Sequence, residues 1–547
     1  MASKYRLNIF VLCLVMLGMF FCSPIFAAIP TFVQEQEILS NDGKANDFFG
    51  WSVAVSDDTL LVGAVDAGDV GQGAAYLYQF QNGTWQQIQE LSPGVSGDFF
   101  GNALSIDNTS LAVSATGAGT AGLVYVYQNA NGTWDLSQVV TPNNTASGLV
   151  FGYTLALHGD TLIVGAPGFQ SNQGAVYVFT RNNGTWIQNQ QIVADDGVDG
   201  DGNGFGSALA FSGDTLVVSS PNFNLAQGAV YVFDLINGTW VQSQKIVGET
   251  VGIIFGESVS IDGTTFIVGA PLGQVDGNTL GVVYVFQKSG DSWIQSQKLA
   301  ANNGAMFDQL GFFVAMEGDV IVAAAPSADV QAPPLNGAVY VFVNEDGTFV
   351  QTQELVGLPG SANDAFGTAL AMHHGKIMVG AQTTNVSSQD FQGSAFLFNA
   401  AQVIVDPQSI SLLAGDSASY TLVLNAPPQG DVVITPSASS SDLSFVSSPI
   451  TFTASNWYIP QTVSFTTLPE TEGEMITISH TASSGDMAYN QISISNVSVA
   501  LISSGHVSGG GCGLRQSNSD SQGFTDFIFL CIGFHLLLHR LMIRQQA

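Results

Sequence analysis

A motif of about 50 residues recurs seven times along this 547-residue chain, and repeats of that length limit the folds open to it. The first copy joins "FGWSVAVSDDTLLVGA", which begins at Phe49, to "GAAYLYQF" and then to "NGTWQQIQEL". The later copies begin at Phe100, Phe151, Phe205, Phe255, Leu310 and Phe366. Because one such unit cannot bury its apolar face alone, the copies must pack against one another.

Each unit contains four predicted strands. In the third unit they are "YTLALH", "TLIVGAP", "AVYVF" and "TWIQNQQI", which are rich in β-branched and aromatic residues and lack a helical period. A tight turn at His158-Gly159-Asp160 joins the first two strands, and "NNGT" is a strong hairpin signal between the last two. Seven four-stranded units predict an all-β chain whose residues 29–400 form a seven-bladed β-propeller.

The seventh unit ends after "GSAFLFNAAQ", without the Trp/Gln strand that closes the other units. A single surplus copy of that strand, "TFVQEQEIL" at Thr31–Leu39, stands ahead of the first unit and closely matches "TFVQTQEL" at Thr348–Leu355. We therefore predict that Thr31–Leu39 pairs with Ala395–Phe398, so that the two ends of the repeat share one sheet. Such closure hides the strand edges that an open array exposes.

The "FG" pairs and the "GAP" triplets, Gly165-Ala166-Pro167 and Gly269-Ala270-Pro271, each followed by a "VYVF" strand, resemble the FG-GAP repeat family. The best-known members of that family are the propeller domains of integrin α subunits. The resemblance implies an extracellular propeller that engages other macromolecules. Many family members carry a D-x-D-x-D-G calcium loop between the first two strands. Here that connection is cut to "SDDT", "HGDT", "SGDT" or "DGTT", which is too short to surround a cation.

A different loop is the candidate calcium site. In "DDGVDGDGNG" (Asp195–Gly204), Asp199, Asp201 and Asn203 alternate ahead of a glycine, as in the first half of a calcium loop. No acidic residue stands where the bidentate glutamate of such a loop would lie. The segment is therefore either a calcium site or a solvated acidic turn, and calcium is the one cofactor predicted.

The charge balance excludes one class of partner. The chain has 11 Lys and Arg residues against 43 Asp and Glu, for a net charge of −32. Such a surface repels phosphate backbones, so no nucleic-acid partner is expected. The four cysteines, Cys13, Cys22, Cys512 and Cys531, all lie in the terminal segments, so the body of the chain has no thiol and no disulfide.

The first 28 residues have the pattern of a secretory signal. Lys4 and Arg6 precede the apolar run from Ile9 to Phe21, and small residues follow, so cleavage is predicted near Ala27 or Ala28. The chain is therefore expected to be exported and to reside at the cell surface or outer membrane, or to be released.

The residue pattern changes after the repeats. Residues 402–501 contain alternating strands separated by Pro, Gly and Ser turns, which predicts a β-sandwich. The element "TFTASNWYIPQTVSF" resembles one found in bacterial Ig-like surface modules, which act as spacers.

The C-terminal segments predict attachment to a membrane. A Gly/Ser linker, residues 502–523, contains Cys512 and precedes a short hydrophobic tail, residues 524–547, with His539, Arg540 and Arg544 near its end. This order is similar to bacterial C-terminal sorting signals of the Gly-rich, Cys-containing kind, which implies processing or lipidation at Cys512. A permanent tail anchor is the alternative.

The pattern of connections predicts where binding occurs. Connections 1–2 and 3–4 of each unit are short, whereas connections 2–3 and 4–1, such as "VDAGDVGQ", "NFNLAQ" and "SADVQAPPLN", are long and varied. The long connections emerge on one face, which is the predicted recognition surface for an extracellular protein or polysaccharide. The alternative is a lyase or hydrolase acting on surface polysaccharide in the propeller channel. No catalytic residue is predicted, because His158, His373 and His374 all lie in the tight 1–2 turns and are interpreted as turn residues.

Overall fold

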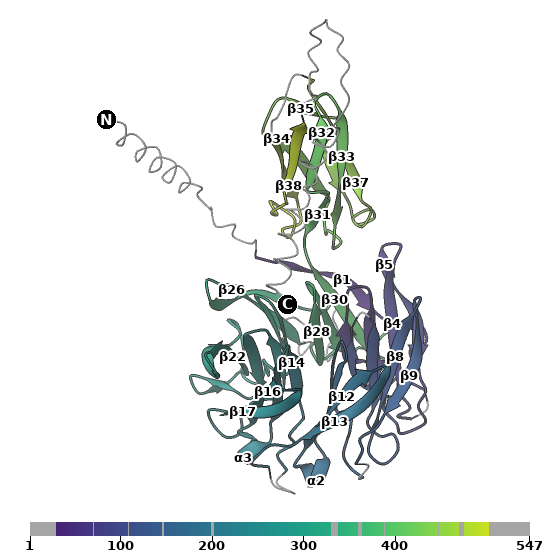
Figure 1. Cartoon of the computed structure of the whole chain (residues 1–547), viewed down its shortest axis with the longest axis vertical. Helices are drawn as coiled ribbons and strands as arrows, with labels where there is room; N and C mark the ends of the chain where they lie inside the picture. Colours follow the sequence, from purple (N-terminus) through teal and green to yellow (C-terminus); the bar gives the residue numbers. More distant parts are fainter. Residues whose placement is uncertain are drawn as a thin grey trace, which may run out of the picture.

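The computed structural model describes residues 29–502, except for 69, 108, 145–146, 198–201, 330–336, 359–363, 388, 447 and 470–474. This part of the chain is almost entirely β-structure, and it contains seven four-stranded antiparallel sheets that form a propeller, followed by a β-sandwich (Figure 1). The all-β fold predicted from the sequence is therefore confirmed. The predicted signal segment, the Gly/Ser linker and the hydrophobic tail lie outside the described residues, apart from Ile502.

The first three sheets each use four consecutive strands. These are β2 (Phe49–Val55), β3 (Leu60–Ala64), β4 (Ala74–Gln81) and β5 (Thr84–Leu91); β6 (Phe100–Ile106), β7 (Ser110–Ala115), β8 (Leu123–Ala130) and β9 (Thr133–Val140); and β10 (Thr154–His158), β11 (Thr161–Ala166), β12 (Ala175–Asn182) and β13 (Thr185–Ile192). A one-turn segment, α2 (Phe169–Asn172), lies between β11 and β12.

The next three sheets repeat this order. They contain β14 (Leu209–Ser212), β15 (Thr215–Ser220), β16 (Ala229–Ile236) and β17 (Thr239–Val247); β18 (Val259–Asp262), β19 (Thr265–Ala270), β22 (Val282–Ser289) and β23 (Ser292–Leu299); and β24 (Val314–Glu317), β25 (Val320–Ala325), β26 (Ala338–Glu345) and β27 (Thr348–Leu355). The loops carry α3 (Phe223–Ala226) and a small ribbon of β20 (Gln274–Val275) and β21 (Asn278–Thr279).

The seventh sheet combines the two ends of the repeat. It contains β28 (Ala369–His373), β29 (Lys376–Ala381) and β30 (Ser394–Ala400), and its outer strand is β1 (Phe32–Ile38). Phe32 pairs with Ala400 and Ile38 pairs with Ala395, so the predicted pairing of the N-terminal strand is confirmed. The innermost strands contact one another in the order β2, β6, β10, β14, β18, β24, β28 and again β2, so the ring is closed.

The FG motif has a packing reason. Phe49 is fully buried against the ring of Tyr76, 5.5 Å between centroids, and the equivalent residues of the other sheets are buried as well. Gly50 has a φ of 91°, and a Cβ atom there would lie 2.2 Å from the backbone oxygen of Ser394. A Cβ atom on Gly380, from the GAP position of the seventh sheet, would lie 2.0 Å from the backbone oxygen of Gly50. The two glycines therefore let the first and last sheets approach closely.

The second domain is a two-layer β-sandwich. One sheet contains β31 (Val403–Asp406), β33 (Ser417–Leu424), β37 (Gln461–Thr467) and β35 (Leu443–Phe445), and the other contains β32 (Ser409–Leu413), β39 (Val497–Ile502), β38 (Met475–Ser484), β34 (Val432–Ala438) and β36 (Ile450–Phe452). A single core that includes Leu422, Phe465 and Ile476 fills the space between the sheets. The domain is a β-sandwich, as predicted, and its Ig-like character stays a prediction.

Within the described residues, neither α2 nor α3 approaches the length and apolar character that a membrane-spanning helix needs.

Candidate functional site

The ring has two unlike faces. The 1–2 turns contain only two residues in the third to seventh sheets, as between His158 and Thr161, and they share one face with the 3–4 hairpins. We call this the short-turn face. The 2–3 and 4–1 connections emerge on the opposite side, the long-loop face, where α2 and α3 lie (Figure 1).

The β-sandwich sits on the short-turn face. The ring of Phe80, in β4, lies 5.7 Å from the ring of Trp457 and 6.2 Å from that of Tyr458 in the sandwich. Asn399, in β30, donates a hydrogen bond from Nδ2 to the backbone oxygen of Asn425 at 2.9 Å. Figure 1 shows the sandwich at the opposite end of the molecule from α2 and α3. The long-loop face therefore points away from the second domain.

The long-loop face exposes apolar side chains. Nine large apolar residues in the 2–3 and 4–1 connections have exposed fractions between 41% and 86%. They are Val70, Val95, Phe99, Leu225, Val251, Met306, Phe307, Leu358 and Phe391. We call this set the apolar loop set.

Backbone hydrogen bonds between adjacent loops hold Phe99 and Phe307 of this set in place, and a similar bond holds Ile254 next to the loop of Leu225. The backbone N–H of Phe99 donates to Gly71 at 2.7 Å, that of Ile254 donates to Ala226 at 2.9 Å, and that of Phe307 donates to Thr279 at 2.7 Å. Each bond joins the 2–3 loop of one sheet to the 4–1 loop that leaves the same sheet. The apolar loop set is therefore presented on a connected scaffold.

The predicted calcium loop is only partly described. Asp199 and Asp201 lie outside the described residues, whereas the backbone oxygen of Asn203 accepts a hydrogen bond from the Ser220 hydroxyl at 2.8 Å. In the same loop, Asp196 accepts a hydrogen bond from the Tyr231 hydroxyl at 3.0 Å and pairs with Lys245. Burial would raise the pKa of Asp196, but the hydrogen bonds from Lys245 and Tyr231 outweigh it and hold that pKa below its usual value. The start of this loop is therefore anchored to the fourth sheet. Cys512, Ala27 and Ala28, the predicted processing sites, also lie outside the described residues.

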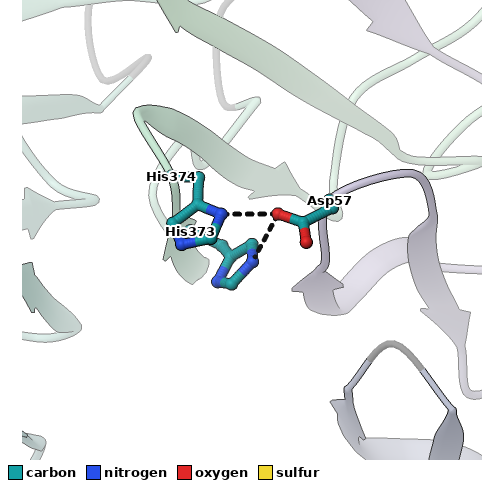
Figure 2. Close-up of side chains that lie close together, drawn as sticks. All are labelled: Asp57, His373 and His374. Carbon is teal, nitrogen blue, oxygen red and sulfur yellow. Dashed lines mark hydrogen bonds and ion pairs between the residues drawn. The ribbon is translucent and has the colours of Figure 1, made fainter. Parts of the chain in front are cut away.

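The structure brings together three residues that the sequence analysis did not group. Asp57, in the 1–2 turn of the first sheet, meets His373, the last residue of β28, and His374, in the 1–2 turn that follows it in the seventh sheet (Figure 2). Asp57 Oδ1 lies 3.0 Å from His373 Nε2 and 2.5 Å from His374 Nδ1. The two imidazole rings stack with centroids 4.0 Å apart.

Sequence reasoning treated both histidines as turn residues. The signal that could have found the cluster was ring closure itself, because closure places the 1–2 turn of the last sheet beside that of the first.

A half-buried carboxyl group lies where β1, the first sheet and the sandwich meet. Glu35 Oε1 accepts a hydrogen bond from Trp85 Nε1 at 2.9 Å, and Glu35 Oε2 accepts one from Asn399 Nδ2 at 3.1 Å. Burial raises the pKa of Glu35 to about 7, against the opposing effects of Trp85, Asn399 and the charge of Lys376. The available sequence signal was that Glu35 is the one charged residue at its repeat position, where the other units have Ile88, Ser137, Asn189, Ser243, Ser296 and Thr352.

Comparison with known proteins agrees with the motifs. The FG-GAP repeat family model matches five segments, residues 32–78, 134–179, 186–233, 240–286 and 293–342. The repeated domain is therefore a β-propeller in which five segments match the FG-GAP repeat. The chain is also similar to mouse (Mus musculus) integrin alpha-2, with 34% identity over 143 residues, which cover 23% of this chain and 12% of the integrin.

Two solved structures share a more distant likeness. Proteins named as 6-phosphogluconolactonases from Bacteroides uniformis ATCC 8492 and Bacteroides fragilis NCTC 9343 each align with a TM-score of 0.40. Their identities are 13% and 14%, and the alignments cover 61% and 62% of this chain and 97% of each of theirs.

Proposed function

We propose that this chain is an exported surface protein whose propeller binds an extracellular protein or glycan through the long-loop face. The observation that carries the proposal is the apolar loop set, which lies on the face turned away from the sandwich. Large exposed apolar side chains are costly in water and are typical of interaction surfaces. Loops on a rigid scaffold are also the usual carriers of recognition.

The charge of the loops indicates what kind of partner fits. Asp276 and Asp390 are exposed in these loops, whereas Lys245 pairs with Asp196 and Lys298 pairs with Glu249 at 2.7 Å. The face therefore combines apolar groups with negative charge. Within the proposal, a protein that presents basic and apolar side chains is the favoured partner, and a glycan is the other outcome.

The sandwich supports a role in presentation. It covers part of the short-turn face near Phe80 and Asn399, and it precedes the predicted C-terminal anchor in the sequence. In this proposal the tail, or a processed anchor near Cys512, holds the chain at the membrane. The long-loop face then points outward. The predicted signal segment would deliver the chain to that location.

An enzyme acting on surface polysaccharide is the second candidate. It is favoured by the contact between His373 and Asp57, because a histidine beside a carboxylate is a common general acid–base arrangement. This pair lies at the short-turn end of the inner strands, away from the long loops. Turnover of surface polysaccharides by the full chain, lost in His373→Asn, would favour the enzyme.

A binding array of extracellular proteins and glycans tests the main proposal. We expect Leu225→Ser with Phe307→Ser, which alters the long-loop face, to weaken binding of the captured ligand at least about tenfold. Ile187→Ser with Ile294→Ser is the matched control, since these residues are 52% and 56% exposed on the outer strands β13 and β23. Equal weakening by both pairs, or by neither, would contradict recognition through this face.

A further inference from the structure

The cluster of Asp57, His373 and His374 has the composition of a transition-metal site. We propose that it binds a zinc ion that links the first and last sheets of the ring. Two imidazole nitrogens and a carboxylate oxygen are ligands that zinc prefers, and the three donor atoms lie within 4.8 Å of one another. Three protein ligands leave a fourth position for water or for an external group.

The distances are compatible with a metal-free site that needs only a small rearrangement to bind zinc. Donor atoms bound to tetrahedral zinc lie roughly 3.3 Å apart, given bonds of about 2.0–2.2 Å. Asp57 Oδ1 lies 3.0 Å from His373 Nε2 and 2.5 Å from His374 Nδ1, so this oxygen must move away from each nitrogen by less than about 1 Å. The side chains are 39%, 32% and 64% exposed for Asp57, His373 and His374, which leaves them room to move and the ion a path to enter.

The backbone of His374 is a second, independent observation. His374 has a φ of 45°, in the left-handed region that is unfavourable for most residues with a Cβ atom. Gly159, Gly213, Gly263 and Gly318 stand at the same turn position in four other units, with φ between 53° and 57°. This conformation of His374 accompanies the stacking of the two rings on one side of the turn, although adjacent strand residues normally point to opposite faces. Backbone strain of this kind is typical of functional positions.

The neighbouring junctions show what the cluster replaces. Between the second and third sheets, Gly159 donates its N–H to Asp107 Oδ2 at 3.1 Å, and between the fifth and sixth sheets Gly318 donates to Asp262 Oδ2 at 2.6 Å. A carboxylate of one turn thus accepts a backbone N–H from the next turn. At the junction that closes the ring, two imidazoles and a carboxylate meet instead. A zinc ion there would tie the end of β28 to the β2–β3 turn.

Zinc titration of the full chain, freed of metal by a chelator, tests the site. We expect the wild type to bind one more zinc ion than Asp57→Asn or the double variant His373→Ala with His374→Ala, by isothermal calorimetry. We also expect zinc to raise the melting temperature of the wild type by about 3 °C and to leave that of Asp57→Asn and of the double variant unchanged. Zinc bound by the terminal cysteines is common to all variants, so the difference isolates this site. His158→Ala is the matched control, because His158 occupies the turn position of His373 and its ring contacts Phe211 rather than a carboxylate.

His374→Gly separates loss of the ligand from loss of the fold. It restores the residue type of the other turns, so without zinc this variant should melt no lower than the wild type. It should nevertheless lose the zinc-dependent rise. Equal zinc stoichiometry and equal melting shifts in the wild type, Asp57→Asn and His374→Gly would overturn the proposal, as would the absence of zinc binding in the wild type.

Discussion

Gln353 and Phe32 are 321 residues apart, and two hydrogen bonds join them. Gln353 Nε2 donates to the backbone oxygen of Phe32 at 2.5 Å, and the Phe32 N–H donates to Gln353 Oε1 at 2.8 Å. The same pair of bonds joins every consecutive pair of outer strands around the ring: Gln36–Trp85, Gln89–Trp134, Gln138–Trp186, Gln190–Trp240, Gln244–Trp293 and Gln297–Phe349. The glutamine side chains therefore form a closed belt, in which β1 takes the place of the missing strand.

Removing one link of this belt should weaken the ring. Gln353→Leu leaves the backbone N–H and carbonyl of Phe32 without their side-chain partner in a partly buried position. We expect a loss of about 2 kcal/mol in the free energy of unfolding, measured by urea denaturation. Gln86→Leu is the control, because Gln86 lies exposed on β5 and its side chain donates a hydrogen bond to Thr84 of its own strand. Equal stability of both variants would mean that the belt contributes little.

Removing β1 altogether should expose the edge of β30. Deletion of Thr31–Leu39 takes away the strand paired with Ala395–Ala400 and uncovers buried Phe396 and Phe398. We expect the deleted chain to aggregate or to melt well below the parent, because an unpaired strand edge recruits other chains. Light scattering and thermal unfolding measure both effects. A monomeric product with an unchanged melting temperature would refute a closing role for β1.

The sequence predicted the repeated core and its closure better than it predicted the contacts between units. The missing strand after Ala400 and the surplus strand at Thr31–Leu39 are complementary, so their pairing followed from the repeat alone. The cluster at Asp57 required knowledge of which turns become neighbours across the closed ring. The burial of Glu35 depends also on how the sandwich docks, through Asn399 and Asn425, and no repeat encodes that contact.

The calcium prediction at Asp195–Gly204 has a direct test. If Asp199, Asp201 and Asn203 bind a cation, millimolar calcium should raise the melting temperature of the parent, and Asp199→Ala with Asp201→Ala should abolish the rise. Asp276→Ala is the control, since it removes a carboxylate from another exposed loop. A parent chain that shows no calcium-dependent shift would identify the loop as a solvated acidic turn.

The C-terminal prediction concerns Cys512 in "GGGCG", directly ahead of the apolar tail. If the segment is a sorting signal, the cell-associated protein should end near Cys512 or carry a lipid there. Cys512→Ala should then retain the full-length chain in the membrane or release it to the medium. Intact-mass measurement distinguishes these outcomes, with Cys531→Ala as the control within the tail. A mature form ending at Ala547 with unmodified Cys512 would support a permanent tail anchor instead.

Glu35 should make the stability of the propeller depend on pH. Its pKa is raised from 4.5 to about 7 by burial, so the folded state holds a proton that the unfolded chain releases at lower pH. Between pH 4.5 and 7 the unfolded chain therefore binds fewer protons than the folded one, and stability falls as pH rises. The contribution of Glu35 to the free energy of unfolding is fully present below pH 4.5, and it is lost as the pH rises through about 7.

Glu35→Gln isolates this contribution, because glutamine has a similar shape and does not ionise. Other buried carboxyl groups with raised pKa values, such as Glu257, act in the same direction in both proteins and cancel in the difference. From pH 4.5 to pH 8 we expect the wild type to lose on the order of 3 kcal/mol of unfolding free energy relative to Glu35→Gln. Urea denaturation at several pH values measures the difference, and Glu345→Gln, at an exposed strand end, serves as the control. Because Glu35 accepts hydrogen bonds from Trp85 of the first sheet and Asn399 of the seventh, we expect the two sheets to lose stability together. Parallel pH profiles of the unfolding free energy for wild type and Glu35→Gln would instead show that the carboxyl group is solvated.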